Sequence, residues 1–256
     1  KALIKQINFV GNEIFTDKEL RKRMKLKEIG KFALFSGSSE YSKQSLEGDQ
    51  EEIRSLYLDS GYADFKIEST QVQLSTDREN VFITISVSEG KKFTFDTFYV
   101  GGDQVVRRED LISLVDIGPG EVFSRKRLTG LTQKIIDRLG EEGYANASVN
   151  PVPEKDIDEF KIGFTLYVNS GQRVYVRRIN INGNSDTKDE VIRRELRQME
   201  GSWYSVKDIN RSKQRLDLLG FFSEVTINTT PVPGTADQVD LEVKVVERMT
   251  GSFSIG

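Results

Sequence analysis

The chain has 256 residues and carries 37 Lys and Arg against 40 Asp and Glu, for a net charge of −3. It therefore lacks the basic surface that phosphate binding requires, and we expect no nucleic-acid partner. The chain has no Cys and no His, which excludes zinc fingers, thiol nucleophiles, imidazole bases and Ser-His-Asp triads. We expect no catalytic, metal-binding or cofactor-binding residues, and hence no enzyme.

A strand that ends in a glycine turn opens the chain, at residues 7–12. Thr16 and Glu19 follow with the spacing of a capping box, in which the hydroxyl accepts from a backbone N–H and the carboxylate reaches back. This spacing predicts the start of a first helix. Residues 31–39 interrupt the pattern and are expected to form a surface loop.

A second helix is indicated by apolar residues on one face, Leu46, Ile53 and Leu56. Gly61 ends this helix, because glycine takes the left-handed cap conformation without steric penalty, and the aromatic Tyr62 follows. Two strands, at 66–74 and 81–87, complete the unit, and the second of them alternates with period two.

The same landmarks occur twice more along the chain. Gly101 and Gly183 align with Gly11 in the opening strands. Helical faces recur at Leu128, Leu131, Ile135 and Leu139, and again at Ile209, Leu216 and Leu219. Thr187 and Glu190 repeat the capping-box spacing, and the closing strands fall at 161–168 and 239–245. Tyr144 and Phe221 repeat the aromatic residue after glycine, so we expect them, like Tyr62, to pack within the fold.

The order strand, helix, helix, strand, strand predicts an α+β fold in which two helices pack on one face of a small three-stranded mixed sheet. We expect domains at residues 1–90, 91–171 and 172–249. The second strand of each unit should lie at a free sheet edge, at 66–74, 148–152 and 224–230.

Neither paired carboxylates nor the single tryptophan indicates a catalytic site. Glu51 with Glu52, and Glu141 with Glu142, are consecutive helical residues that point in different directions, which is typical of a solvated surface. Trp203 is expected to pack in the core at a helix-loop junction rather than to anchor an interface.

Several sequence runs carry a resemblance to a known family. They are residues 57–63 (YLDSGYA), 69–72 (STQV), 193–201 (RRELRQMEG), 219–222 (LGFF) and 246–256 (VERMTGSFSIG). Together these runs resemble the last three of the five POTRA domains in the BamA family of outer-membrane assembly factors. The POTRA arm of a related secretion or translocation barrel is the alternative.

The resemblance implies a periplasmic segment of an outer-membrane protein from a Gram-negative bacterium. Two further domains would precede Lys1, and a membrane barrel would follow, its first strand starting within residues 250–256. The implied function is a scaffold that docks accessory lipoproteins and guides unfolded outer-membrane protein strands. In that role an extended client would add to a free sheet edge.

Two sets of residues are candidates for binding. Ile67, Val72 and Leu74 lie on the edge strand of the first unit, which by resemblance also docks a BamB-type lipoprotein, although such residues can equally face the helices. On the last unit, the resemblance assigns a BamD-type lipoprotein to Asp189, Arg193, Arg197 and Glu200. An ordinary surface ion pair is the alternative there.

Overall fold

The computed structural model describes residues 2–29 and 39–248. The expected barrel strand at 250–256, and residues 31–38 of the expected loop, lie outside this part of the chain. The elements of the first repeat are β1 (Leu3–Val10), α1 (Asp17–Arg23), α2 (Lys43–Asp59), β2 (Lys66–Leu74) and β3 (Asn80–Ser88). Those of the second are β4 (Thr94–Gly102), α3 (Arg108–Ile112), α4 (Arg125–Glu141), β5 (Ser148–Asp156) and β6 (Lys161–Asn169). Those of the third are β7 (Tyr175–Asn182), α5 (Asp189–Glu195), α6 (Val206–Leu218), β8 (Phe222–Pro231) and β9 (Gln238–Glu247).

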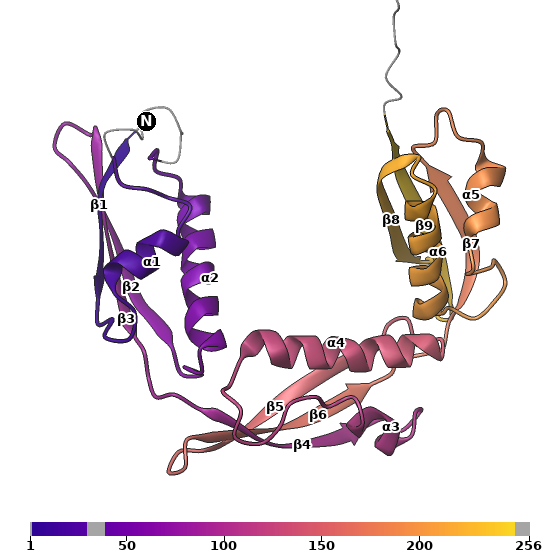
Figure 1. Cartoon of the computed structure of the whole chain (residues 1–256), viewed down its shortest axis with the longest axis horizontal. Coiled ribbons are helices and arrows are strands. Elements are labelled where there is room, and N and C mark those ends of the chain that lie inside the picture. Colours follow the sequence, from indigo (N-terminus) through magenta and orange to yellow (C-terminus); the bar gives the residue numbers. More distant parts are fainter. Residues whose placement is uncertain (1, 30–38, 249–256) are drawn as a thin grey trace, which may run out of the picture. The chain divides into compact units, whose positions relative to one another are not determined.

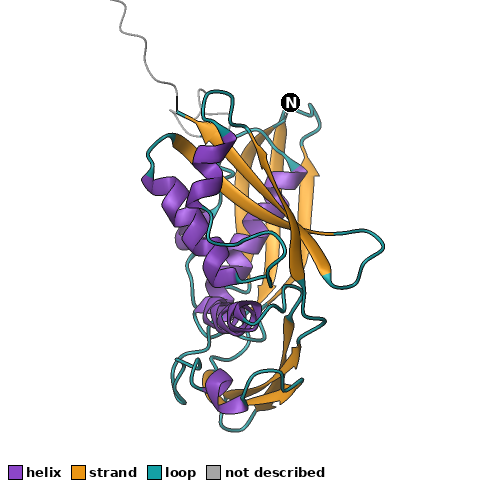
Figure 2. Ribbon diagram, turned by 90° about the vertical axis from the view of Figure 1, so that its right-hand side faces the viewer, coloured by secondary structure: helices purple, strands orange, loops and turns teal. Residues whose placement is uncertain are grey.

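The described strands form three sheets of three strands, in the orders β1-β3-β2, β4-β6-β5 and β7-β9-β8. In the first and third sheets the opening strand pairs in parallel with the central one, and the second strand pairs antiparallel. Each sheet is combined with helices (Figures 1 and 2). The expected α+β fold, with a mixed three-stranded sheet in each repeat, is confirmed. The β1-β3-β2 sheet lies in one compact unit of the chain and the β7-β9-β8 sheet in another.

The first repeat encloses its own core between α1, α2 and one face of the sheet (Figure 1). Helix α1 starts with the expected capping box: the Thr16 hydroxyl accepts from the N–H of Glu19, and the Glu19 carboxylate accepts from the N–H of Thr16. Leu46 and Ile53 of α2 are buried, while Leu56 packs on the core from a partly buried position. Burying one such side chain contributes about 1.5–3 kcal/mol, so this face of α2 holds the helix on the sheet.

The third repeat has a separate core, and its first helix begins differently from the expectation. Helix α5 starts at Asp189 after Lys188, and no side chain caps it. The predicted capping box at Thr187 and Glu190 is therefore wrong. The reason is that both the backbone N–H and the side chain of Thr187 are already bonded to Glu247 at the end of β9.

The turn glycines correct the alignment of the repeats. Gly11, Gly102 and Gly183 have φ of +88°, +87° and +90°. A Cβ added at these glycines would lie 2.3, 2.1 and 2.0 Å, respectively, from a backbone oxygen of the central strand. Only glycine fits such a close backbone approach at positive φ. Gly102, rather than Gly101, is thus the counterpart of Gly11.

Two aromatic residues are more exposed than expected. Tyr62 is buried, but Phe221 is 51% exposed and the next residue, Phe222, is buried in its place. The third repeat starts β8 directly at Phe222, without the short turn that separates Gly61 from β2 in the first repeat, so Phe221 is turned outward. Trp203 is 52% exposed instead of buried, and the Arg173 guanidinium stacks over its ring at 4.3 Å.

Candidate interaction surfaces

The outer edge of the opening strand is covered by the chain segment that follows the first helix. In the first repeat the Ile4 N–H donates to the Ser39 carbonyl at 2.8 Å, and the Ile29 N–H donates to the Ile4 carbonyl at 2.9 Å. In the third repeat Val176 makes the same two bonds, with Ser202 at 2.9 Å and Gly201 at 2.7 Å. At these positions the edge has no free backbone groups to offer a partner.

One arginine and one glutamate cover the next outward position of the same edge, and we call this pair the edge clamp. In the first repeat Glu28 accepts from the Ile7 N–H at 2.8 Å, and Arg21 donates to the Ile7 carbonyl at 3.1 Å. Arg21 and Glu28 are themselves 3.2 Å apart. The two side chains occupy both backbone groups that a neighbouring strand would use.

The third repeat has the same edge clamp, built from two of the predicted docking residues. Glu200 accepts from the Ile179 N–H at 2.7 Å, and Arg193 donates to the Ile179 carbonyl at 3.0 Å. Arg193 also bonds Asp189 at 2.7 Å, which raises the pKa of its guanidinium above the ordinary value. Arg197 is exposed and caps the end of α5 by donating to the Leu196 carbonyl at 3.0 Å.

These contacts bring three of the four predicted docking residues together, since Arg193 bonds both Asp189 and Glu200, whereas Arg197 lies apart from them at the end of α5. They also give Arg193 and Glu200 a structural role that sequence reasoning missed. The side chains of Asp189, Arg193 and Glu200 remain 50%, 45% and 46% exposed, so a partner could still reach them.

On the opposite side of the first sheet, β2 is an edge strand. Adjacent residues of a strand direct their backbone groups to opposite sides of it. The backbone groups of Ile7 point outward to the edge clamp, so those of the next residue, Asn8, point inward to β3. In a parallel pair they bond to the residues on either side of the register partner of Asn8, which is Thr84. Thr84 must then face β2, where it pairs with Gln71. The residues that alternate with Gln71 present their N–H and C=O groups outward; they are Thr70, Val72 and Leu74.

Two of these outward-facing residues also have exposed apolar side chains. Val72 and Leu74 are 40% and 52% exposed. They are in register with the buried residues Ile83 and Val81 of β3, so their side chains lie on the core side of the sheet, beyond the cover of the helices. Ile67, the third candidate, instead packs on the core from a partly buried position.

The edge strand of the third repeat is a poorer acceptor for an added strand. The same geometric argument turns the backbone groups of Ile227, Thr229 and Pro231 outward. Pro231 stands where the first repeat has Leu74, and proline has no N–H to donate. In the second repeat β5 contains Pro151 and Pro153 at alternate positions, which removes two donors from one side of that strand.

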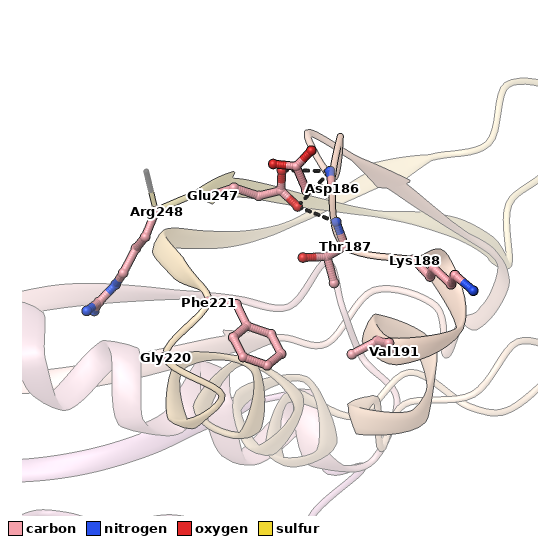
Figure 3. Close-up of a pocket in the computed structure, with 8 residues that line it drawn as sticks. All are labelled: Asp186, Thr187, Lys188, Val191, Gly220, Phe221, Glu247 and Arg248. Carbon is pink, nitrogen blue, oxygen red and sulfur yellow. Dashed lines mark hydrogen bonds between the residues drawn. The ribbon is translucent and has the colours of Figure 1, made fainter. Parts of the chain in front are cut away.

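A pocket in the third repeat lies where the end of β9 meets the turn after β7 (Figure 3). Its polar side is the Glu247 carboxylate, and Phe221 and Val191 contribute apolar surface. Glu247 accepts from the backbone N–H groups of Asp186 and Thr187 at 2.9 and 2.7 Å, and from the Ser185 hydroxyl at 2.7 Å. These hydrogen bonds lower the pKa of Glu247 to about 2, and the bond from the Asp186 N–H has the largest effect. Glu247 thus fixes the exit of β9 against the turn.

Three of the four carboxylates considered as acid-base candidates, Glu51, Glu141 and Glu142, form ion pairs. Glu51 contacts Arg54 at 3.3 Å, and Arg138 contacts Glu141 and Glu142 at 3.8 and 2.9 Å. Within the described residues no group of acidic side chains is arranged to hold a metal ion. None of the helices in the same part of the chain is long and apolar enough to cross a membrane.

Three successive β-α-α-β-β repeats, each with its second strand at a sheet edge, define a class of modular α+β repeat domains. The chain belongs to the POTRA family, described as surface antigen variable number repeat, which matches residues 2–90, 95–171 and 174–248. The resemblance inferred from the sequence is confirmed. The POTRA domains of BamA proteins are periplasmic, and the chain is accordingly a periplasmic part of an outer-membrane protein.

Sequence relatives include two proteins named outer membrane protein assembly factor BamA. That of Neisseria meningitidis is 35% identical over 99% of this chain and 32% of its own length. That of Buchnera aphidicola is 31% identical over 99% of this chain and 41% of its own length. The chain therefore spans well under half the length of these relatives.

Two solved structures extend the likeness to the fold. The crystal structure of Haemophilus influenzae BamA POTRA3-5 matches with a TM-score of 0.79 and 32% identity, covering 96% of both chains. The structure of Haemophilus ducreyi BamA lacking POTRA domains 1-3 matches with a TM-score of 0.53 and 33% identity, over 62% of this chain and 30% of that one.

Proposed function

We propose that this chain is a periplasmic scaffold in outer-membrane protein assembly, which captures extended protein segments on β2 and docks an accessory lipoprotein on the third repeat. The observation that carries the first part is the outward row Thr70, Val72 and Leu74. Its main-chain groups supply affinity that tolerates varied sequences, and its two exposed apolar side chains give the added strand a surface to pack on.

The occupants of this edge follow from its chemistry. An unfolded outer-membrane barrel strand alternates polar and apolar residues, so its apolar face can cover Val72 and Leu74 while its backbone bonds to β2. A loop of a BamB-type lipoprotein that adopts an extended form would use the same groups. Residues 69–74 contain no charge, proline or glycine, the features that usually keep an edge strand from pairing.

Replacing Val72 with Pro tests strand addition, because its N–H faces outward rather than into the β2-β3 ladder. The Val72→Pro variant is expected to fold and to bind a barrel-strand peptide about 2- to 10-fold more weakly, as the loss of one backbone hydrogen bond predicts. Binding is measured by fluorescence anisotropy, and folding by circular dichroism.

Two matched variants separate the possible causes. Val72→Thr keeps the donor and the branched shape, so it reports the apolar side chain alone. Gln71→Pro removes a ladder bond and is expected to destabilise the first repeat. Unchanged peptide affinity in a folded Val72→Pro protein would show that segments do not add to this edge.

The second part of the proposal places a BamD-type lipoprotein on Asp189, Arg193, Arg197 and Glu200. Its support is that all four charged residues are exposed and that Arg193 joins Asp189 and Glu200 in one cluster. Arg197→Glu is the sharpest test, because Arg197 takes no part in the edge clamp. We expect at least about tenfold weaker binding, the effect of setting like charges against each other at an interface.

Lys213→Glu, an equal change of charge at an exposed position of α6, is the matched control and should bind normally. Calorimetric titration with the soluble, lipid-free lipoprotein from the same bacterium measures both variants. If Arg197→Glu and Lys213→Glu bind with equal affinity, the lipoprotein does not use this surface.

A further inference from the structure

The pocket beside Glu247 in the third repeat has a volume of about 450 Å³, within the range of about 300–1,000 Å³ that is typical of ligand sites. The Phe221 ring and the Val191 side chain lie on two sides of it, and the side chains of Lys188 and Arg248 extend away from the ring (Figure 3). Phe221 is 51% exposed. The pocket therefore offers apolar and aromatic surface to a partner.

The corresponding place in the first repeat is filled by aromatic side chains. Just after the turn glycine, the Asn12 amide donates to the Phe15 carbonyl at 2.9 Å. The Asn184 amide makes the same bond with the Thr187 carbonyl at 3.0 Å. Thr187 thus stands at the position of Phe15. The Phe15 ring packs edge-on against the Tyr57 ring of α2, with centroids 4.9 Å apart.

The carboxylate beside the pocket also has a counterpart in the first repeat. Glu247 accepts from the Asp186 N–H in the turn after β7. Glu89, at the end of β3, accepts from the Ile14 N–H in the turn after β1 at 3.0 Å. The Tyr57 hydroxyl donates to Glu89 at 2.6 Å, and Tyr57 is fully buried. In the first repeat the space beside this carboxylate thus holds a tyrosine ring.

The third repeat has neither of these two rings. Thr187 replaces Phe15, and α6, with the sequence VKDINRSKQRLDL, has no aromatic residue to replace Tyr57. Tyr62 adds a third ring to the first repeat, 5.9 Å from Tyr57, whereas Phe221 is turned outward. The same fold therefore holds aromatic rings at this place in one repeat and has a pocket there in the other.

We propose that this pocket binds an aromatic side chain, of Phe or Tyr, from an unfolded outer-membrane protein. The first repeat indicates the ligand class, because there the fold holds a tyrosine ring against the equivalent carboxylate. The composition of the clients indicates the source, because membrane barrel strands carry girdles of aromatic residues. A ring between Phe221 and Val191 also covers the exposed Phe221, and aromatic pairs stabilise a contact beyond the area they bury.

This inference rests on the client capture proposed above and adds a second kind of contact to it. The edge strand β2 binds the backbone of an extended segment, with little dependence on its sequence. The pocket selects a side chain. A client with suitably placed aromatic residues is therefore bound more tightly than one of the same length without them.

Titration of the whole chain with N-acetyl-tyrosinamide tests the ligand class. The methyl signals of Val191 report binding in NMR spectra, and we expect saturable shifts because the bound ring lies against this side chain. N-acetyl-leucinamide is the matched probe without a ring and should shift these signals far less. Equal responses to the two probes, or no saturable response to the first, would overturn an aromatic site.

Two variants change the pocket, and one serves as their control. Thr187→Phe supplies a ring from within and should weaken tyrosinamide binding at least about tenfold, the effect of losing the burial of one aromatic side chain. Val191→Glu charges an apolar wall and introduces the residue that the first repeat has at this position, Glu19. Leu218→Ser removes an apolar side chain that is 85% exposed and does not line the pocket, so it should bind normally. If both pocket variants have native amide spectra and bind like the wild type, the site is wrong.

A barrel-strand peptide with benzoylphenylalanine in place of one aromatic residue tests the occupant. After photolysis, mass spectrometry should locate crosslinks at residues 187–191 or 220–222, which Thr187→Phe removes and Val72→Pro retains. Crosslinks confined to β2 would overturn the client as occupant while upholding strand addition in the first repeat. Crosslinks in neither place would reject client capture itself. Val191 signals that shift with the soluble lipoprotein and not with the peptide would assign the pocket to the lipoprotein and overturn the proposal.

Discussion

Replacing Glu28 with Ala removes one half of the first edge clamp and should open the backbone of β1 at Ile7. The Ile7 residue is 1% exposed, and its N–H donates to Glu28 at 2.8 Å. A hydrogen bond to a charged group contributes about 1.5–3 kcal/mol. Because the Glu28 side chain is 35% exposed, water can replace part of that contribution, and we expect a loss of about 1–2 kcal/mol.

Hydrogen exchange resolved by residue measures this loss where it occurs. A loss of 1–2 kcal/mol corresponds to roughly 5- to 30-fold faster exchange of the Ile7 amide in the native state. Glu28→Gln keeps a side-chain oxygen acceptor and should show a smaller increase. Glu200→Ala makes the matched change in the third repeat, and should affect Ile179 while leaving Ile7 unchanged. If the Ile7 amide of folded Glu28→Ala exchanges at the wild-type rate, Glu28 does not protect this edge.

Two further predictions concern the third repeat. Gly183→Ala would place a Cβ 2.0 Å from a backbone carbonyl oxygen, whereas at Gly201 no atom lies within 4 Å of an added Cβ, and both glycines have positive φ. Thermal unfolding should therefore show Gly183→Ala to be at least about 2 kcal/mol less stable than Gly201→Ala, because Gly201→Ala bears only the cost of the left-handed backbone. Equal stabilities of the two variants would contradict the close approach at Gly183. The pKa of Glu247 is lowered to about 2, so its stabilising bonds are fully present above pH 4.5 and are lost as the pH falls toward 2. Urea unfolding between pH 2 and 7 should show this acid-dependent loss in the wild type and not in Glu247→Gln, and parallel pH profiles would refute it.

Periodic and local patterns in the sequence were sufficient to predict the fold. Hydrophobic spacing located α2, α4 and α6, and Leu131, Ile135 and Leu139 are indeed buried. The capping box at Thr16 depends on residues three apart in one helix, so it could be recognised from sequence alone. Repetition of these signals three times then fixed the order of elements.

The features that the sequence did not predict involve partners distant along the chain. Thr187 has the right neighbour for a capping box, but Glu247, sixty residues later, takes its N–H. Phe221 follows a glycine like Tyr62, yet the direct start of β8 turns it outward. Arg193 and Glu200 could be singled out as charged residues of one flank, but their bonds to the backbone of Ile179 depend on how the loop after α5 folds over β7.

The repeats therefore share a fold and differ in the chemistry of their sheet edges. On the opening strand of the first and third repeats, covering segments and an Arg-Glu clamp take up the outward backbone groups at two positions, which favours strand addition at the other edge. At that other edge, Leu74 of β2 has an N–H that Pro231 of β8 lacks. We therefore expect extended segments to add to the first repeat rather than to the third, where the charged helix surface is the proposed docking site.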